Sequence, residues 1–461
     1  MAVAAPSGPS APVPSAPSGR HFVPSNRCGR DRKSQGRRQS PRPGGAGGHR
    51  RAAGRLTIGC HLPTATLPHG VDTMLFDGLE PQLESLLDEV FARSEIHSAT
   101  MAVASGAGDF RWAGARGEIS PAGPATKPDT PWFTASITKL FIAGTVMRMV
   151  EEGELALEDR LVGRLPGAIT HRLHVLKGED RTGEITVEHL LAHASGLPDF
   201  IEDHPPKGGP AGRDRRSLVD ILLEEGDRDW PLEETSRRVR EALAPHFPPQ
   251  KLRGPRVRIR YSDTNYQLLT GIVEARRNTS FADALEALVL EPLELDDTWI
   301  PGHPRGGKPE AEVPTLYAGT EIVEFPRFFA SISDLHATSD DLVRFLRAVE
   351  EGRLFRSPAT WERMQARWNR FPLPRDRASL RQPGWPIEYG LGVMRFHLPR
   401  ALTPFRPVPA VIGHTGSTGT WLFHARELDL YLAGAVNQVT AGAVPFRLVP
   451  EVLRAAMAAR R

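Results

Sequence analysis

Apolar residues recur at helical spacing over residues 79–93, the first clearly patterned part of the chain. Leucine, valine and phenylalanine fall on one face and acidic residues on the other, which is typical of an amphipathic helix. Two short alternating runs follow, at 100–105 and 110–115, on either side of Gly106-Ala107-Gly108. This arrangement predicts a β-hairpin.

The middle of the chain shows mainly helical spacing. After Pro131 a broad apolar face continues to about Gly153 and predicts a helix with Ser136 in its first turn. Further helices are predicted at 187–192, 218–225, 237–243, 266–275, 281–289 and 340–350, the last with Ser339 as N-cap. The pattern then changes to strands at 411–415, 420–425 and 428–436, followed by a helix at 449–458.

These elements predict an α+β fold in which strands from both ends of the chain form one antiparallel sheet flanked by helices. We expect a sheet lobe at about 74–135 and 370–461 and an inserted α-rich lobe at about 136–369. A chain of 461 residues can build one large domain or two intertwined lobes. No run approaches the roughly 18 apolar residues of a membrane-spanning helix, so no membrane span is expected.

Charge is distributed unevenly. Residues 1–60 contain eleven Arg and Lys residues and a single acid, Asp31, although the formal charge of the whole chain is only +3. The remainder is therefore mildly acidic. Rich in Gly and Pro and with one aromatic residue, Phe22, this stretch cannot bury enough apolar surface to offset its ordering entropy. We predict a disordered basic tail over residues 1–73.

The basic tail has three interpretations: an arm for nucleic acid, a solvated extension, or residues upstream of a true start at Met74. Its arginines lack aromatic or periodic organisation, so no nucleic-acid partner is expected. No apolar segment follows the arginine pairs at 37–38 and 50–51, so no signal peptide is recognised. A cytoplasmic location is the default expectation, and a secreted one the alternative if the start lies elsewhere.

The sharpest chemical feature is Ser136-Ile137-Thr138-Lys139. A serine hydroxyl is a poor nucleophile until a neighbouring group takes its proton, and i, i+3 spacing places the lysine amine on the same helical face. The motif alone is weak, because a capping serine followed by a surface lysine gives the same letters.

Two more motifs strengthen the interpretation of Ser136 as a nucleophile. Tyr261-Ser262-Asp263 lies 125 residues downstream of Ser136, and His414-Thr415-Gly416 lies on a predicted strand 153 residues beyond Tyr261. In this order and spacing the three resemble the serine β-lactamase and penicillin-binding-protein superfamily, in particular its branch of class C β-lactamases, D-alanyl-D-alanine carboxypeptidases and esterases. The stretches 188–198 and 389–392 are similar to family segments as well, so the resemblance spans about residues 79–461.

The resemblance implies a β-lactamase/transpeptidase-like fold and a serine hydrolase that forms an acyl-enzyme. Ser136 would be the nucleophile, and Lys139 and Tyr261 would share the work of the general base. The backbone N–H groups of Ser136 and Ser417 would form the oxyanion hole. Substrate would contact the remaining motif residues, Asp263, His414, Thr415 and Gly416. The substrate would be a small ester or peptide, with no metal and no organic cofactor.

One residue departs from the family pattern. The second motif more often ends in Asn, whereas this chain has Asp263. An ionised carboxylate keeps Lys139 charged and weakens it as a base, which shifts proton removal toward Tyr261. A carboxylate is also a poor partner for a substrate amide carbonyl. The expectation is therefore a small carboxylic ester as substrate, with a D-amino-acid peptide or a β-lactam as the other options. The alternative is a catalytically silent protein that binds peptidoglycan peptides or a partner.

Competing sites are poorly supported. His189 and His193 have the i, i+4 spacing of zinc ligands, but neither the glutamate of an HExxH motif nor a third ligand follows, which favours structural roles. G-x-S-x-G is absent, so no α/β-hydrolase nucleophile elbow is expected. The two cysteines, Cys28 and Cys60, exclude a disulfide scaffold. The basic stretch 251–260 alternates charged and apolar residues and predicts an edge or surface strand.

Overall fold

The computed structural model describes residues 76–460, apart from 94, 210, 211, 213, 306–308, 374, 375, 377–379, 381, 401, 402 and 404–406. The predicted tail, Met74 and both cysteines lie outside the described residues. None of the described helices is long and apolar enough to cross a membrane.

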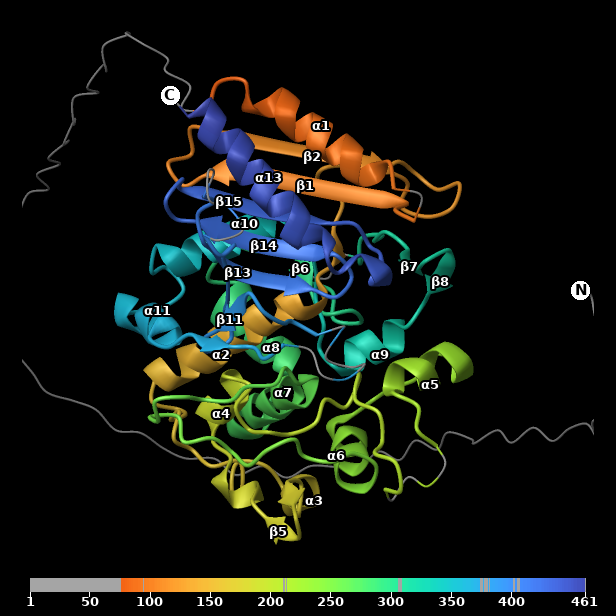
Figure 1. Ribbon diagram of the computed structural model, residues 1–461, viewed down its shortest axis with the longest axis vertical. Coiled ribbons are helices and arrows are strands. Elements are labelled where there is room, and N and C mark those ends of the chain that lie inside the picture. Colours follow the sequence, from red (N-terminus) through yellow and green to blue (C-terminus); the bar gives the residue numbers. More distant parts are fainter. Residues whose placement is uncertain are drawn as a thin grey trace, which may run out of the picture. The chain divides into compact units, whose positions relative to one another are not determined.

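An eight-stranded antiparallel sheet joins the two ends of the sequence, in the order β10-β11-β12-β13-β14-β15-β1-β2 (Figure 1). Near the N-terminus the hairpin β1–β2 pairs with β15 of the C-terminal region. The prediction of one antiparallel sheet built from both ends is therefore confirmed. The strands are β1 (Ser98–Ser105), β2 (Arg111–Gly117), β10 (Asn369–Arg370), β11 (Ile387–Tyr389), β12 (Met394–Phe396), β13 (Val411–Gly416), β14 (Thr420–Ala425) and β15 (Leu430–Ala435).

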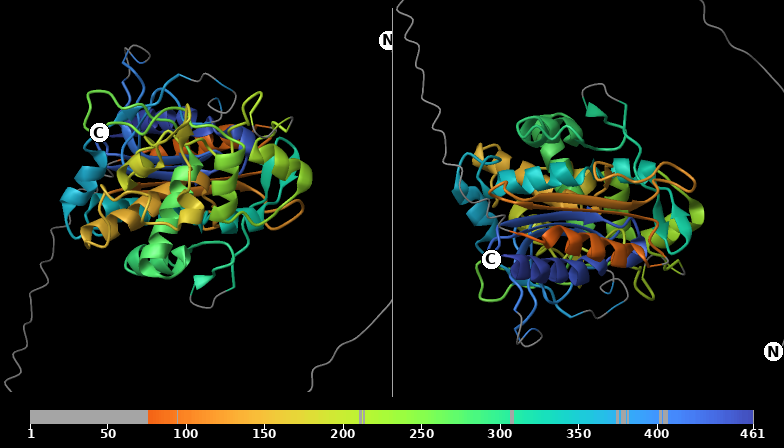
Figure 2. Two further views of the ribbon diagram at one scale, coloured as in Figure 1. Left: turned by 90° about the horizontal axis from the view of Figure 1, so that it is seen from below. Right: turned by 90° about the horizontal axis from the view of Figure 1, so that it is seen from above.

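Helices cover both faces of this sheet (Figure 2). One face carries α1 (Leu79–Phe91) and α13 (Val444–Ala459), which contact each other and the strands. Leu79, Leu83 and Leu87 of α1 are fully buried, as the helical spacing predicts. The opposite face carries α10 (Ser339–Glu350), which contacts β1, β14 and β15. The predicted lobe boundary assigns α10 to the α-rich lobe, but the helix packs on the sheet.

The α-rich lobe lies below the sheet in Figure 1 and is centred on α2 and α7. Its elements, with the short helices and strands that border it, are η1 (Ala135–Ile137), α2 (Thr138–Glu151), α3 (Gly167–Thr170), η2 (Thr182–Glu184), α4 (Val187–Leu191), α5 (Leu218–Glu225), α6 (Leu232–Glu241), α7 (Asp263–Arg277), α8 (Phe281–Leu285), the π-helical turn η3 (Glu286–Leu290), α9 (Pro326–Ser331), α11 (Pro358–Gln365) and η5 (Val439–Ala441). Small sheets pair β3 (Trp132–Phe133) with β9 (His336–Ala337), β9 with β6 (Thr298–Trp299), β4 (Val175–Leu176) with β5 (Glu179–Asp180), and β7 (Leu316–Ala318) with β8 (Glu321–Val323).

Three local predictions are wrong. The N-cap of α10 is Thr338, whose hydroxyl accepts from the Asp341 N–H, whereas Ser339 accepts from the Trp132 indole. Helix α6 begins at Leu232, before the predicted 237, because Pro231 and two acids favour a helix start there. No strand forms over 251–260, since this stretch is held by separate contacts to loops instead of a ladder.

Candidate active site

Ser136 lies at the junction of η1 and α2, where its side chain is partly exposed. One helical turn later, the Lys139 ammonium donates to the Ser136 hydroxyl oxygen at 3.2 Å, as the i, i+3 spacing predicts. Ala135, just before the serine, has a left-handed backbone with φ of 49°. Such a conformation costs on the order of 1–3 kcal/mol in a residue with a side chain and persists only where surrounding structure enforces it.

Asp263 forms a salt bridge with Lys139. It is the first residue of α7, where the helix dipole favours a carboxylate, and Ser262 occupies the N-cap position. Burial acts to lower the pKa of Lys139, but Asp263, Tyr261 and Asp334 together outweigh it, so the pKa of Lys139 is raised above its ordinary value. Lys139 is therefore an ammonium at rest, in agreement with the prediction from Asp263.

Tyr261 is buried, and among the described residues its hydroxyl makes no hydrogen bond of ordinary geometry, although Ser136 and Lys139 are close enough to act on it. The Lys139 ammonium lies 5.1 Å from the centre of its ring. Burial raises the pKa of Tyr261, and the nearby Lys139 and Ser136 lower it only in part, so the phenol is protonated at rest. A buried polar atom without a partner is costly, and it marks a position where a ligand atom can complete the bonding.

His193 supports the second motif from behind. Its Nδ1 accepts hydrogen bonds from the Ser262 N–H at 3.2 Å and from the Asn265 amide at 3.1 Å, and its ring centre lies 4.4 Å from that of Tyr261. Burial lowers its pKa well below the ordinary value, so the ring is neutral. His189 bonds Thr186 and the Gln250 carbonyl instead. The two histidines therefore bond different partners, and no group of three or more His, Cys, Asp or Glu side chains within the described residues could hold a metal.

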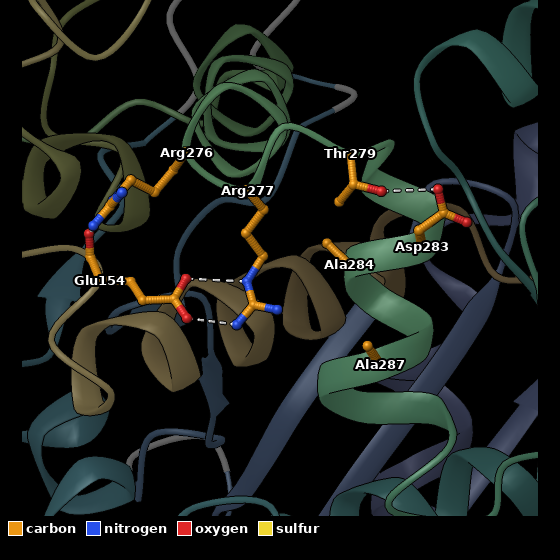
Figure 3. Close-up of a pocket in the computed structure, with 7 residues that line it drawn as sticks. All are labelled: Glu154, Arg276, Arg277, Thr279, Asp283, Ala284 and Ala287. Atoms are coloured by element: carbon orange, nitrogen blue, oxygen red, sulfur yellow. Dashed lines mark hydrogen bonds and ion pairs between the residues drawn. The ribbon is translucent and has the colours of Figure 1, made fainter. Parts of the chain in front are cut away.

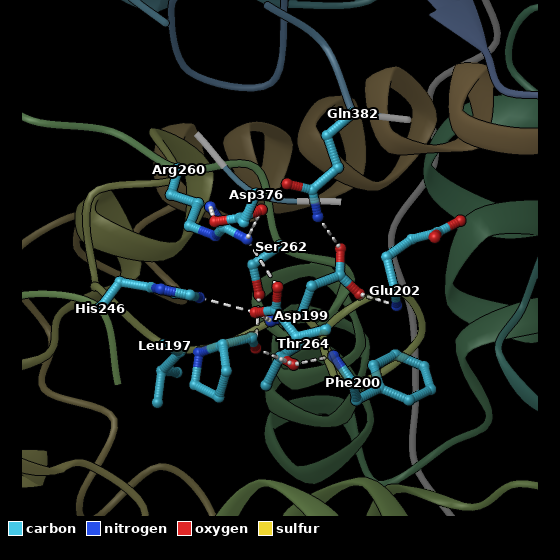
Figure 4. Close-up of polar contacts among 12 residues, drawn as sticks. Leu197, Asp199, Phe200, Glu202, His246, Arg260, Ser262, Thr264, Asp376 and Gln382 are labelled. Atoms are coloured by element: carbon cyan, nitrogen blue, oxygen red, sulfur yellow. Dashed lines mark hydrogen bonds and ion pairs between the residues drawn. The ribbon is translucent and has the colours of Figure 1, made fainter. Parts of the chain in front are cut away.

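A polar network holds the segment before α7 (Figure 4). Buried Asp199 accepts from the Asp263 N–H at 3.3 Å and from the Gln382 amide at 2.9 Å. Next to it, Asp203 accepts from Arg260 and His246, both at 2.6 Å. Because Arg260 immediately precedes Tyr261, the network fixes the backbone on both sides of the second motif.

The third motif closes against the first at a point of tight backbone approach. A Cβ placed on Gly416, at the end of β13, would lie 2.8 Å from the Ala135 Cβ and 2.9 Å from the Thr134 carbonyl oxygen. The Thr420 hydroxyl also donates to that carbonyl, at 3.0 Å. Glycine is therefore required at position 416. Ser417 follows in the exposed turn before β14, so its N–H lies one residue beyond the contact with the Ser136 segment.

His414 and Thr415 do not both face a substrate, because neighbouring residues of a strand point to opposite faces. His414 is fully buried; its Nδ1 donates to the Thr415 carbonyl, and Nε2 accepts from the Tyr389 hydroxyl at 3.1 Å. Burial lowers the pKa of His414 to about 3, so it carries no charge. The Thr415 hydroxyl is directed to Met394 Sδ at 3.7 Å. Both side chains are buried in contacts within the protein, and their role toward a substrate stays a prediction.

Asp334 is an acidic residue close to the motif residues that the sequence did not single out. It follows Ser333, which has φ of 62°, and precedes Leu335, whose N–H donates to the Thr138 hydroxyl at 3.1 Å. This places Asp334 beside the start of α2. Burial and the negative charge of Asp263 raise its pKa against the opposing effect of Lys139, to about 7. It belongs to no motif, and only the packing of residues 333–337 along 132–138 brings it here.

A cavity of about 570 Å³ lies elsewhere, near the end of α7 (Figure 3). Arg277 and Glu154 inside it form a paired salt bridge, and the Thr279 hydroxyl donates to Asp283 at 3.0 Å. A cavity of about 760 Å³ borders Arg260 and His246, next to the network of Figure 4. Neither is lined by Ser136, so the converging motifs mark the candidate active site better than cavity size does.

Known proteins match this chain over most of its length. The Beta-lactamase family model covers residues 83–455. Esterase EstB of Burkholderia gladioli is 26% identical over 301 residues, which span 59% of this chain and 70% of EstB. Penicillin-binding protein 4* of Bacillus subtilis (strain 168) is 26% identical over 179 residues, 37% of this chain and 31% of that protein.

Solved structures share the fold. The D-stereospecific amidohydrolase from a Streptomyces species superposes with a TM-score of 0.58 at 24% identity, covering 81% of this chain and 98% of the other. D-amino acid amidase from Ochrobactrum anthropi SV3 superposes with a TM-score of 0.60 at 20% identity, and the match covers 83% of this chain and 99% of the amidase. These matches confirm the predicted β-lactamase/transpeptidase-like fold. Together with the family match, they support a serine hydrolase that acts on esters or amides. The chain belongs to the Beta-lactamase family, within the serine β-lactamase and penicillin-binding-protein superfamily.

Proposed function

We propose that this protein hydrolyses small carboxylic esters through an acyl-enzyme on Ser136. The observation that carries the proposal is the contact of the Ser136 hydroxyl with the Lys139 ammonium at 3.2 Å, beside the buried phenol of Tyr261. A nucleophile, a fixed positive charge and a group able to exchange a proton thereby occupy one place. The esterase relative supports the same reaction class.

In this proposal Lys139 acts as a charge and not as a base. Its pKa is raised by Asp263, so the ammonium persists at neutral pH and stabilises negative charge on Ser136 Oγ and on Tyr261. Tyr261, as phenolate, accepts the serine proton during attack, and as phenol it returns the proton to the leaving alcohol. In deacylation Tyr261 takes a proton from water while the water oxygen bonds the acyl carbon. The bond from that carbon to Ser136 Oγ then breaks, and Tyr261 returns the proton to Oγ.

The oxyanion formed during attack would accept hydrogen bonds from the backbone N–H groups of Ser136 and Ser417. The tight approach of Gly416 to Ala135 supports this assignment, because it brings the end of β13 against the segment that carries Ser136. Gly416 lines the site through its backbone. Fixed donors of this kind are worth about 10²–10³ in rate.

Asp263 favours ester over amide. Its carboxylate is one-fifth exposed and bonded to Lys139, so it offers no hydrogen-bond donor to a substrate amide carbonyl. Esters need less leaving-group assistance than amides, which suits a site whose lysine stays charged. D-amino-acid peptides and β-lactams are therefore the weaker candidates.

The test is Ser136→Ala assayed with p-nitrophenyl acetate. We expect a loss of at least about 10³-fold in kcat/KM with an unchanged circular dichroism spectrum. Labelling with a fluorophosphonate, followed by peptide mass spectrometry, should place the adduct on Ser136 and on no other serine. Unchanged turnover in the variant would rule out the proposal.

The alternative is a silent binder on the same fold. The raised pKa values of both Lys139 and Tyr261 favour it, because neither group is a base at rest. A silent pocket should leave Ser136 unlabelled by fluorophosphonate at any pH up to 9, whereas the enzyme should be labelled faster as pH rises.

A further inference from the structure

His193 contacts Tyr261 and both residues that flank it in the chain. The His193 carbonyl oxygen accepts from the Arg260 N–H at 3.0 Å, and the ring Nδ1 accepts from the Ser262 N–H at 3.2 Å. The imidazole also lies against the Tyr261 ring, with the ring centres 4.4 Å apart and the planes tilted by 34°. One fully buried residue thereby holds the backbone before and after the proposed base and packs against its ring.

The backbone of His193 is in an uncommon conformation. Its φ is 53°, in the left-handed region. Histidine enters this region more readily than most residues with a side chain, but the conformation persists only where the surrounding structure enforces it. In this conformation the carbonyl oxygen and the ring of a single residue both reach the segment 260–262.

Hydrogen bonds fix the tautomer of the His193 ring. Nδ1 accepts a second hydrogen bond from the Asn265 amide at 3.1 Å, and the Asn265 carbonyl oxygen accepts from the Ser195 hydroxyl at 2.7 Å. An Nδ1 that accepts two hydrogen bonds carries no proton, so the ring proton lies on Nε2. Because protonation of Nδ1 would break both bonds, the geometry keeps the ring neutral.

The Nε2–H group of His193 has no hydrogen-bond partner in the described part of the chain. Three tyrosine rings surround the imidazole instead, with centres at 4.4 Å for Tyr261, 4.7 Å for Tyr389 and 5.1 Å for Tyr266. An N–H group among aromatic faces can form weak hydrogen bonds with them. The imidazole therefore fits closely between its two Nδ1 donors and these rings, and the place of the Tyr261 ring depends on it.

The hydroxyl end of Tyr261 lacks such support. It makes no hydrogen bond of ordinary geometry with any described residue. The place of the phenol oxygen relative to the Ser136 hydroxyl therefore depends on how the backbone and the ring of Tyr261 are held. Proton transfer needs the two oxygens within hydrogen-bond reach, and a displacement of about 1 Å can cost about 10²-fold in rate.

Resting on the function proposed above, we propose that His193 is a positioning residue for the reaction, which holds the Tyr261 phenol within reach of the Ser136 hydroxyl. Because His193 is fully buried, it acts through Tyr261 and not on the substrate. Its loss should lower kcat and leave KM nearly unchanged. Tyr261 remains the base, so the rise of the rate between pH 7 and 9 should persist. The role also accounts for a histidine whose spacing from His189 led to no metal site.

The test is a double-mutant cycle with p-nitrophenyl acetate. His193→Ala removes both the Nδ1 acceptor and the ring, and we expect kcat to fall on the order of 10²-fold with KM within about threefold of the wild type. In the Tyr261→Phe background the same substitution should cost less than about threefold, because the group that it positions is gone. A merely structural role would give the same loss in both backgrounds.

Two further variants sharpen the result. His193→Asn places an acceptor oxygen at the position of Nδ1 and suits the left-handed backbone, so it should recover about tenfold of the loss in His193→Ala. His189→Asn is the matched control, since this buried histidine bonds Thr186 and the Gln250 carbonyl. It should unfold at lower urea concentration than the wild type while kcat of the folded protein stays within about twofold.

The outcomes separate the two proposals. If His193→Ala keeps kcat within about twofold, or costs as much with Tyr261→Phe as without it, the inference about His193 fails and the hydrolase stands. If His193→Ala does not fold, the same comparison made with His193→Asn in both backgrounds decides. If Ser136→Ala leaves hydrolysis unchanged, the proposed function itself fails.

Discussion

Two neighbouring clusters in the α-rich lobe place a cation among carboxylates, yet only one of them has the parts of a catalytic site. In the first, Lys139 bonds Asp263 and lies in contact with the Ser136 hydroxyl. In the second, Arg260 bonds Asp203 at 2.6 Å and Asp376 at 3.0 Å (Figure 4). Tyr261 follows Arg260 directly in the chain, so the two clusters are adjacent in sequence.

The difference lies in the cation and its neighbours. A guanidinium cannot lose its proton in a protein and forms several directed hydrogen bonds, which suits a fixed support. Both Asp203 oxygens are occupied, by Arg260 and His246, and no serine or tyrosine hydroxyl bonds to the pair within the described residues. Lys139 instead touches a nucleophile. The pattern of charges alone thus does not distinguish a catalytic cluster from a structural one. The serine hydroxyl beside the cation does.

Replacing the cation of each cluster, Lys139 or Arg260, should give the largest difference in kcat/KM between the two clusters. Lys139→Met removes the charge beside Ser136, and we expect kcat/KM for a p-nitrophenyl ester to drop about 10²–10⁴-fold. Arg260→Lys keeps a charge in the supporting cluster and should stay within about tenfold of the wild type. Steady-state kinetics on both, with circular dichroism to check folding, makes the comparison. Equal losses would mean that the clusters do not differ as described.

Tyr261→Phe tests the proton path and should cost about 10²-fold or more in kcat/KM. Because burial raises the pKa of Tyr261 above 10, only a small fraction is phenolate at pH 7, and that fraction increases about tenfold per pH unit. The wild-type rate should therefore rise steadily between pH 7 and 9, and the variant should lose this rise. A wild-type profile that is flat over this range would exclude Tyr261 as the base.

Asp203→Asn should damage stability more than chemistry. It leaves Arg260 and His246 without their buried partner, which should reduce the free energy of unfolding by about 2–4 kcal/mol at pH 7, with kcat/KM of the folded fraction changed only a few-fold. Burial acts to raise the pKa of Asp203, but His246 and Arg260 together have the larger, opposite effect. The pKa of Asp203 therefore lies below its ordinary value. The stabilisation is therefore present above about pH 4 and lost as pH falls through the folded pKa.

Urea unfolding at pH 7 and pH 3.5 measures that effect. The difference between wild type and Asp203→Asn should shrink at the lower pH, because the native carboxylate then begins to protonate. A deficit that is equal at both values would mean that the side chain supports the network by shape and not by charge.

Asp334→Asn should give the smallest change in the free energy of unfolding. Unlike Asp203→Asn, it should stabilise the protein. The pKa of Asp334 is about 7 in the folded protein and near 4 when unfolded, so the folded state binds its proton more tightly and stability is lost as pH rises from about 4 to 7. The groups that act on it are Lys139, Asp263 and the Thr138 hydroxyl. The variant should unfold with about 1–3 kcal/mol more free energy than the wild type at pH 8 and with no gain at pH 4.5. Thermal unfolding at both pH values decides it, with Asp88→Asn, which removes an exposed carboxylate of α1, as control.

Periodicity and short motifs predicted the elements that local sequence determines. The spans of α5 and β14 match their predictions residue for residue, and the helical turn from Ser136 to Lys139 gives the contact that its spacing implies. Boundaries failed where competing caps lie side by side, as at Thr338 and Ser339, because each hydroxyl can bond the same kind of N–H and only the Trp132 indole decides between them.

The supporting residues could not be predicted in the same way. His193 was interpreted as structural, and its bond to the Ser262 N–H explains how. Asp199 and Asp334 carry no motif, and each is an ordinary acid in a loop until packing places it beside α7 or α2. His414 belongs to a motif, but the alternation of β13 turns it toward Tyr389 and away from solvent.

By itself the sequence determined which residues could do chemistry and which local element carries each, because helix and strand periodicity and i, i+3 spacing depend on neighbours within a few positions. Only the tertiary structure decided their charge states and partners. A pKa depends on burial and on charges brought together across more than a hundred residues, such as Lys139 and Asp263. That juxtaposition arises when α7 packs against α2.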